Sequence, residues 1–318
     1  MVLLIQKINK LYSKLENHYH HHKQQQRDDP PPPEALRTAL QSFRSQVSSS
    51  FTKLLLTPKP GLEISLQWVH NCFELLPVVN KAFAKLVMDL DHPMSKWAQG
   101  SVREYLNQSL SLLDLLNSIS SSLSSLGQSR LSFAHALALI DGSPSSALDR
   151  LKTTQLSSSC NKVTYREENG DVDGKVASLC EREAIIHEAL MEMKTVGFWV
   201  TSILVACLSG DAKAYLETRR PISVAVLASV DSVVSGIAME KGIVAKEVRD
   251  LKESAVKVAA EISSNRGGCG VAAEEMERKL EVFEKLLDGL RKDVDRLFSE
   301  ILVGRNELLR RFRHGEQY

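Results

Sequence analysis

Histidine and carboxylate side chains are the groups in this sequence that could hold a metal ion or move a proton. A tract near the N-terminus contains four histidines, namely His18, His20, His21 and His22. Histidine-rich tracts can take up metal ions, and a solvated tract without a ligand is the alternative. The surrounding segment, ENHYHHHKQQQRDDPPPPE, is polar and rich in proline, so we expect no core that would fix these imidazoles in place.

His187 is the histidine with acidic neighbours, because Glu183 precedes it by four residues and Glu188 follows it. No third ligand stands at helical spacing from this group, and His70 and His135 also lie in helical runs without a partner. The sequence contains neither His-Glu-x-x-His nor Gly-x-Ser-x-Gly. We therefore expect a chain that is not an enzyme, with no catalytic residue, no cofactor and no metal-binding residue.

The glycine-rich stretch NRGGCG, residues 265–270, has the composition of a phosphate-binding loop. Such a loop follows a strand and is completed by Gly-Lys-Ser/Thr, and neither condition is met here. The stretch is typical of a turn that ends one helix before another begins.

Composition narrows the class of protein. The chain has 318 residues, of which 43% are hydrophobic, so it can form a sizeable core. Lys and Arg (40) nearly balance Asp and Glu (39), whereas proteins that bind nucleic acid usually have a basic excess, so no nucleic-acid partner is expected. The five cysteines include no Cys-x-x-Cys pair and are odd in number, which indicates a reducing, cytoplasmic location.

The secondary-structure elements that would hold these side chains are helices. Apolar residues recur at spacings of three and four, and no stretch of useful length alternates between apolar and polar residues as a strand does. We predict an all-α fold, an elongated bundle of about six to seven long helices that ends in an antiparallel, coiled-coil-like hairpin. The expected helical runs are 36–54, 68–90 with a kink at Pro77, 93–126, 129–140, 176–217, 224–264 and 272–312.

Four segments follow from this pattern. Residues 1–34 comprise an amphipathic segment and a disordered linker, 35–140 a first helical half, 141–172 a flexible loop, and 173–318 a second helical half. We expect the two halves to form one bundle. The first fifteen residues lack a secretory signal and contain one serine, which is unlike a serine-rich transit peptide, so plastid import is the lesser alternative.

The segment TVGFWVTSILVACLSG, residues 195–210, contains sixteen uncharged residues in a row. A membrane-spanning helix needs about twenty apolar residues, with a range of about 17–25, so two interpretations stay open. Residues 196–210, including Phe198, Trp199, Ile203 and Leu204, form either a buried core helix or a membrane anchor. The basic C-terminal residues Arg310, Arg311 and Arg313 are candidate contacts for an anionic membrane surface or for a partner.

The segment YLNQSLSLLDLLN, residues 105–117, resembles the Tyr-Leu-x-x-Ser-x-x-Leu-Leu-Asp block of the plant BYPASS family, which is also grouped with ROH-type proteins. Trp97 upstream and the apolar window that ends in Ser209-Gly210 fit the same family, and order and spacing agree from about residue 35 to the C-terminus. The resemblance implies a land-plant protein that acts in root and shoot development and restrains a root-derived mobile signal. It also implies Exo70-type exocyst subunits as partners and association with membranes for some members, and it carries over no catalytic residue.

Three functional hypotheses follow. The first is a non-enzymatic helical adaptor in development and exocyst-linked trafficking, whose uncovered apolar faces bind partner helices. The second is a membrane protein anchored through 196–210. The third is a carrier or enzyme for a small molecule in the synthesis of a mobile signal, which would need a deep pocket lined by convergent polar groups. The sequence leaves the oligomeric state open.

Overall fold

The regular elements in the described part of the chain are all helical, as predicted. The structure is a computed structural model that describes residues 33–55, 64–92, 94–156, 180–212, 215–216, 225–264 and 270–315. The elements are α2 (Pro33–Leu55), α3 (Leu66–Phe73), α4 (Leu75–Asp89), the 3₁₀ turn η1 (Met94–Lys96), α5 (Gln99–Ala138), α6 (Pro144–Thr153), α7 (Glu181–Ser209), α9 (Ala225–Lys241), α10 (Lys246–Ser263) and α11 (Gly270–Gly315).

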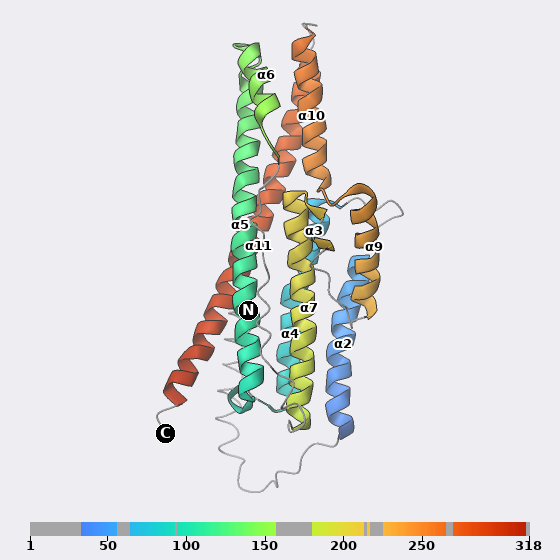
Figure 1. Cartoon of the computed structure of the whole chain (residues 1–318), viewed down its shortest axis with the longest axis vertical. Coiled ribbons are helices and arrows are strands. Elements are labelled where there is room, and N and C mark those ends of the chain that lie inside the picture. Colours follow the sequence, from blue (N-terminus) through green and yellow to red (C-terminus); the bar gives the residue numbers. More distant parts are fainter. Residues whose placement is uncertain are drawn as a thin grey trace.

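The helices are arranged as an elongated bundle (Figure 1). At a rise of about 1.5 Å per residue, the 46 residues of α11 extend for about 70 Å, and the 40 residues of α5 for about 60 Å. In Figure 1, α10 and α11 form the predicted antiparallel hairpin, and the hairpin packs beside α5 and α6 at one end of the molecule. Toward the other end, α2, α4 and α5 pack on α7, and α9 packs on α2.

The apolar stripes read from the sequence form the core. In α11 the buried residues follow spacings of three and four, as a heptad seam requires: Met276, Leu280, Phe283, Leu287, Leu290, Val294, Leu297 and Ile301. In α2 the same spacing buries Leu36, Leu40, Phe43, Val47 and Phe51. Helices from before and after residue 141 contribute to a single core cluster.

The break predicted near residue 127 is wrong, because α5 continues through the serine-rich stretch to Ala138. Leu123 and Leu126 are fully buried, so packing fixes the helix there. The serine hydroxyls donate to carbonyls one turn back, as Ser122 does to Ser118 over 3.0 Å and Ser124 to Ser120 over 2.9 Å. The hydroxyls therefore bond within the helix and do not compete with it.

Three other boundaries differ from the prediction. The chain breaks at Glu74, between α3 and α4, so that Pro77 lies in the first turn of α4, where a missing N–H does no harm. The predicted run 224–264 is interrupted after Lys241 by Gly242, whose φ of +74° favours glycine. Residues 144–153 form α6 and are not part of a loop, while 157–172 lie outside the described residues.

A clasp joins the start of α3 to the start of α10. The backbone N–H of Lys246 donates to the carbonyl of Ile64 over 2.8 Å, and the carboxylate of Glu247 accepts from the N–H of Leu66 over 2.8 Å. Ser65 caps α3 by accepting from the N–H of Trp68 over 3.1 Å. Glu247 therefore satisfies an N–H at a helix start that is far away in sequence.

We predict that Glu247→Ala lowers the free energy of unfolding by about 1–2 kcal/mol, because a charge-assisted bond to the end of α3 is lost. Glu253→Ala, at an exposed position on the same helix, is the control and should change stability by less than about 0.5 kcal/mol. Urea unfolding followed by circular dichroism measures both. Equal effects of the two variants would contradict a role for the clasp.

Candidate functional site

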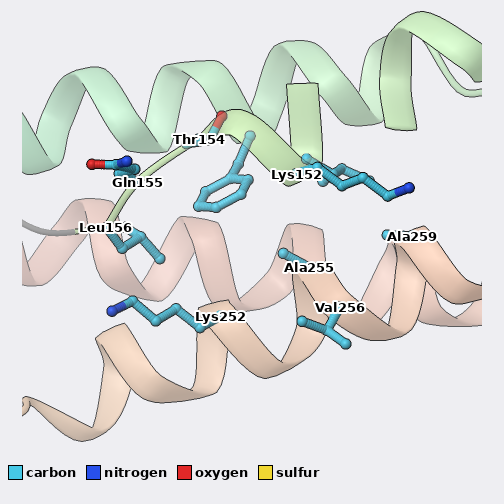
Figure 2. A pocket seen from close by; sticks show the side chains of 10 residues that line it. Lys152, Thr154, Gln155, Leu156, Lys252, Ala255, Val256 and Ala259 are labelled. Carbon is cyan, nitrogen blue, oxygen red and sulfur yellow. The ribbon is translucent and has the colours of Figure 1, made fainter. Parts of the chain in front are cut away.

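A groove of about 490 Å³ lies between α5, α6 and α10 (Figure 2). Its apolar lining comes from all three helices and from the stretch that follows α6: Phe133, Leu151, Leu156, Ala255, Val256 and Ala259. Phe133, Leu151 and Leu156 are at most 5% exposed and form the floor. Val256, by contrast, is 69% exposed and presents an apolar side chain at the rim.

The stretch after α6 is held in place by side-chain bonds to backbone carbonyls. The hydroxyl of Ser129, on α5, donates to the carbonyl of Gln155 over 2.7 Å. The hydroxyl of Thr154 donates to the carbonyl of Arg150 over 2.7 Å and so covers one of the carbonyls left open at the end of α6. These bonds fix the wall of the groove that α6 forms against α5.

Two lysines give the groove its charge. Lys152 of α6 and Lys252 of α10 both line it, and their ammonium groups extend in opposite directions along it (Figure 2). Both lysines are exposed, so their heads stay hydrated while their stems add to the apolar surface. An apolar floor with a basic rim suits a ligand that is apolar on one side and acidic at its edges.

The predicted apolar helix 196–210 is the second half of α7 and lies inside the bundle. Trp199, Ile203 and Leu204 are at most 5% exposed, and Phe198 is half-buried. The ring of Trp199 packs edge-on against Phe51 of α2, with 5.9 Å between centroids. Length and composition would allow α7 to cross a membrane, yet 72% of its most apolar window is buried by protein.

Polar partners fix this helix to α9. The indole N–H of Trp199 donates to a carboxylate oxygen of Asp231 over 3.0 Å, and the hydroxyl of Tyr215 donates to the same oxygen. Asp231 is 3% exposed. Asp231 therefore serves as a buried acceptor between α7 and α9.

The acidic neighbours of His187 form ion pairs with other residues. Glu183 pairs with His92, with 2.9 Å between Oε2 and Nε2, and both side chains are at most 9% exposed. Glu188 pairs with Arg44 of α2 over 2.5 Å. Sequence reasoning missed the buried pair of His92 and Glu183, because 91 residues separate its members.

Other predicted site residues cannot be placed by their side chains. Arg310, Arg311 and Arg313 fall on the last part of α11, but their side chains lie outside the described residues. The histidine tract 18–22 and residues 265–269 of the glycine-rich stretch also lie outside them. Sequence reasoning likewise missed the groove, although the exposed Val256 within a polar face of α10 was a usable signal.

Comparison with known proteins supports the family resemblance. Protein BPS1, chloroplastic, of Arabidopsis thaliana is 22% identical over 292 residues, which cover 86% of this chain and 83% of the relative. The chain is a distant homologue of this BYPASS protein.

UPF0496 protein 4 of rice, in both the japonica and the indica subspecies, is 29% identical over 205 residues. The match covers 58% of this chain and 44% of the rice proteins, so the chain spans less than half the length of these relatives. No family model matches the chain, and no solved structure matches it significantly.

The buried thiols are poor nucleophiles. Burial raises the pKa of Cys72 well above its ordinary value, and the neighbouring Cys207 raises it further. Burial also raises the pKa of Cys207, with a smaller contribution from the charge of Glu247. The thiolate is the reactive form, so both residues stay protonated and inert at neutral pH.

We predict that iodoacetamide at about pH 8 modifies Cys72 and Cys207 only after unfolding, because a raised pKa and burial both remove the thiolate. Cys180 is exposed and serves as the internal reference for fast labelling. Peptide mass spectrometry measures the extent of modification at each site. Labelling of Cys72 or Cys207 in the folded protein at the rate of Cys180 would contradict the prediction.

Proposed function

We propose that this chain is a non-enzymatic helical adaptor that binds a partner helix in the groove between α5, α6 and α10. The observation that carries the proposal is the groove itself, with a buried apolar floor and a largely exposed Val256 at its rim. A helix laid into a groove buries an apolar stripe at spacings of three and four, which matches an elongated trough between helices.

The rim selects the chemistry of the partner. Lys152 and Lys252 favour acidic residues beside the apolar stripe of the partner helix. Opposite charges at a rim mainly raise the association rate and suppress wrong partners, while the apolar contact supplies affinity. The proposed occupant is therefore an amphipathic helix with Asp or Glu along its edges.

A small-molecule carrier fits the groove less well. Carrier sites enclose most of the ligand and direct several polar groups at it. Here the rim residue Val256 is mostly exposed, and the hydroxyl of Thr154 already donates to a backbone carbonyl of α6. The groove thus offers an apolar surface open to solvent and few directed polar contacts.

The resemblance supplies the biological setting of the proposal. We propose Exo70-type exocyst subunits as the partners and exocyst-linked trafficking in root and shoot development as the process. The basic residues Arg310, Arg311 and Arg313 are the proposed contact with anionic membranes at such sites. The Arabidopsis relative is named chloroplastic, whereas we propose a cytoplasmic location for this chain, because its five cysteines are odd in number and include no Cys-x-x-Cys pair.

We predict that Val256→Glu abolishes capture of exocyst or other trafficking proteins by the tagged full-length chain from plant tissue. The new carboxylate removes apolar contact area and repels an acidic partner, which weakens binding at least about tenfold. Val233→Glu, at a position 48% exposed on α9, is the matched control. Mass spectrometry of the captured proteins measures the outcome.

Charge reversal gives a second comparison within one helix. Lys252→Glu should weaken binding of the same partner, whereas Lys257→Glu, also exposed on α10 but outside the groove, should leave it unchanged. Failure of the wild-type chain to capture any trafficking protein would contradict the adaptor function. If both Val256→Glu and Lys252→Glu still capture the same partner, the adaptor function stands but the groove is not its binding site.

We also propose that α7 is a core helix and not a membrane anchor. We predict that alkaline carbonate releases the full-length chain from plant membranes into the supernatant, because this treatment detaches proteins held only at the membrane surface, whereas a spanning helix stays in the bilayer. A single-pass membrane protein in the same preparation is the control. Retention of the chain in the pellet would establish 196–210 as the anchor.

A further inference from the structure

Three side chains that can ligate a metal converge where the end of α3 meets α11. They are His70, Glu74 and Asp293, and one ligand atom from each lies within 4.8 Å of the other two. His70 and Glu74 are four residues apart, so they project from the same side of the α3 segment. Asp293 comes from α11, more than 200 residues later.

The contact between His70 and Asp293 is not an ordinary hydrogen bond. Nδ1 of the imidazole lies 2.9 Å from Oδ2 of the carboxylate. Oδ2 is nevertheless buried and accepts no hydrogen bond, so the two atoms are close without the alignment that an N–H donor needs. A buried carboxylate oxygen without a donor is costly, and a shared cation would satisfy it.

Arg296 pairs with only one oxygen of each of the two carboxylates, Glu74 and Asp293. Its guanidinium lies 2.9 Å from Oε1 of Glu74 and 2.9 Å from Oδ1 of Asp293. One oxygen of each carboxylate remains available for another ligand contact. The side chain of Arg296 is 51% exposed, so it can turn toward solvent without a large rearrangement.

We propose that His70, Glu74 and Asp293 bind a divalent transition-metal ion of the Zn²⁺ class. Two ligand atoms that each lie about 2.1 Å from one ion can be at most about 4.2 Å apart. The ligand atoms of His70, Glu74 and Asp293 lie within 4.8 Å of one another, so they need to move only slightly closer to hold the ion. One imidazole and two carboxylates suit zinc, and water completes the shell on the exposed side of Glu74. The ion would tie α3 to α11, in contrast with the sequence-based expectation of no metal site.

Zinc titration of the full-length chain tests the site. The histidine tract would bind zinc too, so the parent protein for the test carries His18→Ser, His20→Ser, His21→Ser and His22→Ser. We expect isothermal titration of this parent with zinc to show about one site that persists in excess magnesium, and zinc to raise its melting temperature.

Single substitutions then locate the ion. His70→Ala and Asp293→Asn should each weaken zinc binding at least about tenfold and remove the rise in melting temperature. His135→Ala, an exposed histidine of α5, is the matched control and should bind as the parent does. Asp293→Asn nearly preserves the size of the side chain, and circular dichroism without metal verifies that each variant folds.

Two results would overturn the proposal. A parent without the histidine tract that binds no zinc shows that the cluster is an ion-pair network alone. Zinc binding that His70→Ala and Asp293→Asn both leave unchanged places the ion elsewhere. Neither result bears on partner binding in the groove, because His70, Glu74 and Asp293 do not line it.

Discussion

Sixteen uncharged residues in a row, 195–210, must be kept from water on nearly every side, and the bundle is arranged around that requirement. A helix with one apolar face needs one layer of neighbours, whereas a helix that is apolar all round needs several. Helices α2, α3, α4 and α5 all pack on α7, and α9 contacts it through the bond between Trp199 and Asp231. The long helices α5 and α11 then extend beyond this core and, with α10 and α6, form the other end of the molecule.

The same core contains polar groups that restrict how its helices can pack. Asp231 accepts from Trp199 and Tyr215, and Glu183 pairs with His92, so each of these two buried acids has its partners outside its own helix. Buried acids stripped of partners are strongly destabilising, so a shifted register would be penalised at these points. Apolar contacts drive the packing of α7, and these bonds select one arrangement among several that would bury similar area.

Periodicity was enough to predict the helices and the hairpin, because burial on one face leaves its mark at spacings of three and four. The seam of α11 was visible in full, from Met276 to Ile301. Local propensity failed where packing outweighed it: a break was predicted near residue 127, after a serine-rich stretch, yet the buried Leu123 and Leu126 hold the helix together. The groove and the cluster of His70, Glu74 and Asp293 depend on which helices meet. A single sequence does not indicate that residues so far apart, such as His70 and Asp293, become neighbours.

The short helix α3 links α10 to α11. Its start is bonded to the first turn of α10 through Leu66 and Glu247, and its end contacts α11 through His70 and Asp293. It therefore bridges the open end of the hairpin that α10 and α11 form, opposite the turn between them. Only eight residues long, α3 could not persist alone, so these contacts hold it in place as much as it holds the hairpin. Lys252 and Val256 follow Glu247 on α10 by less than three turns, so the position of this edge of the groove depends on the bridge.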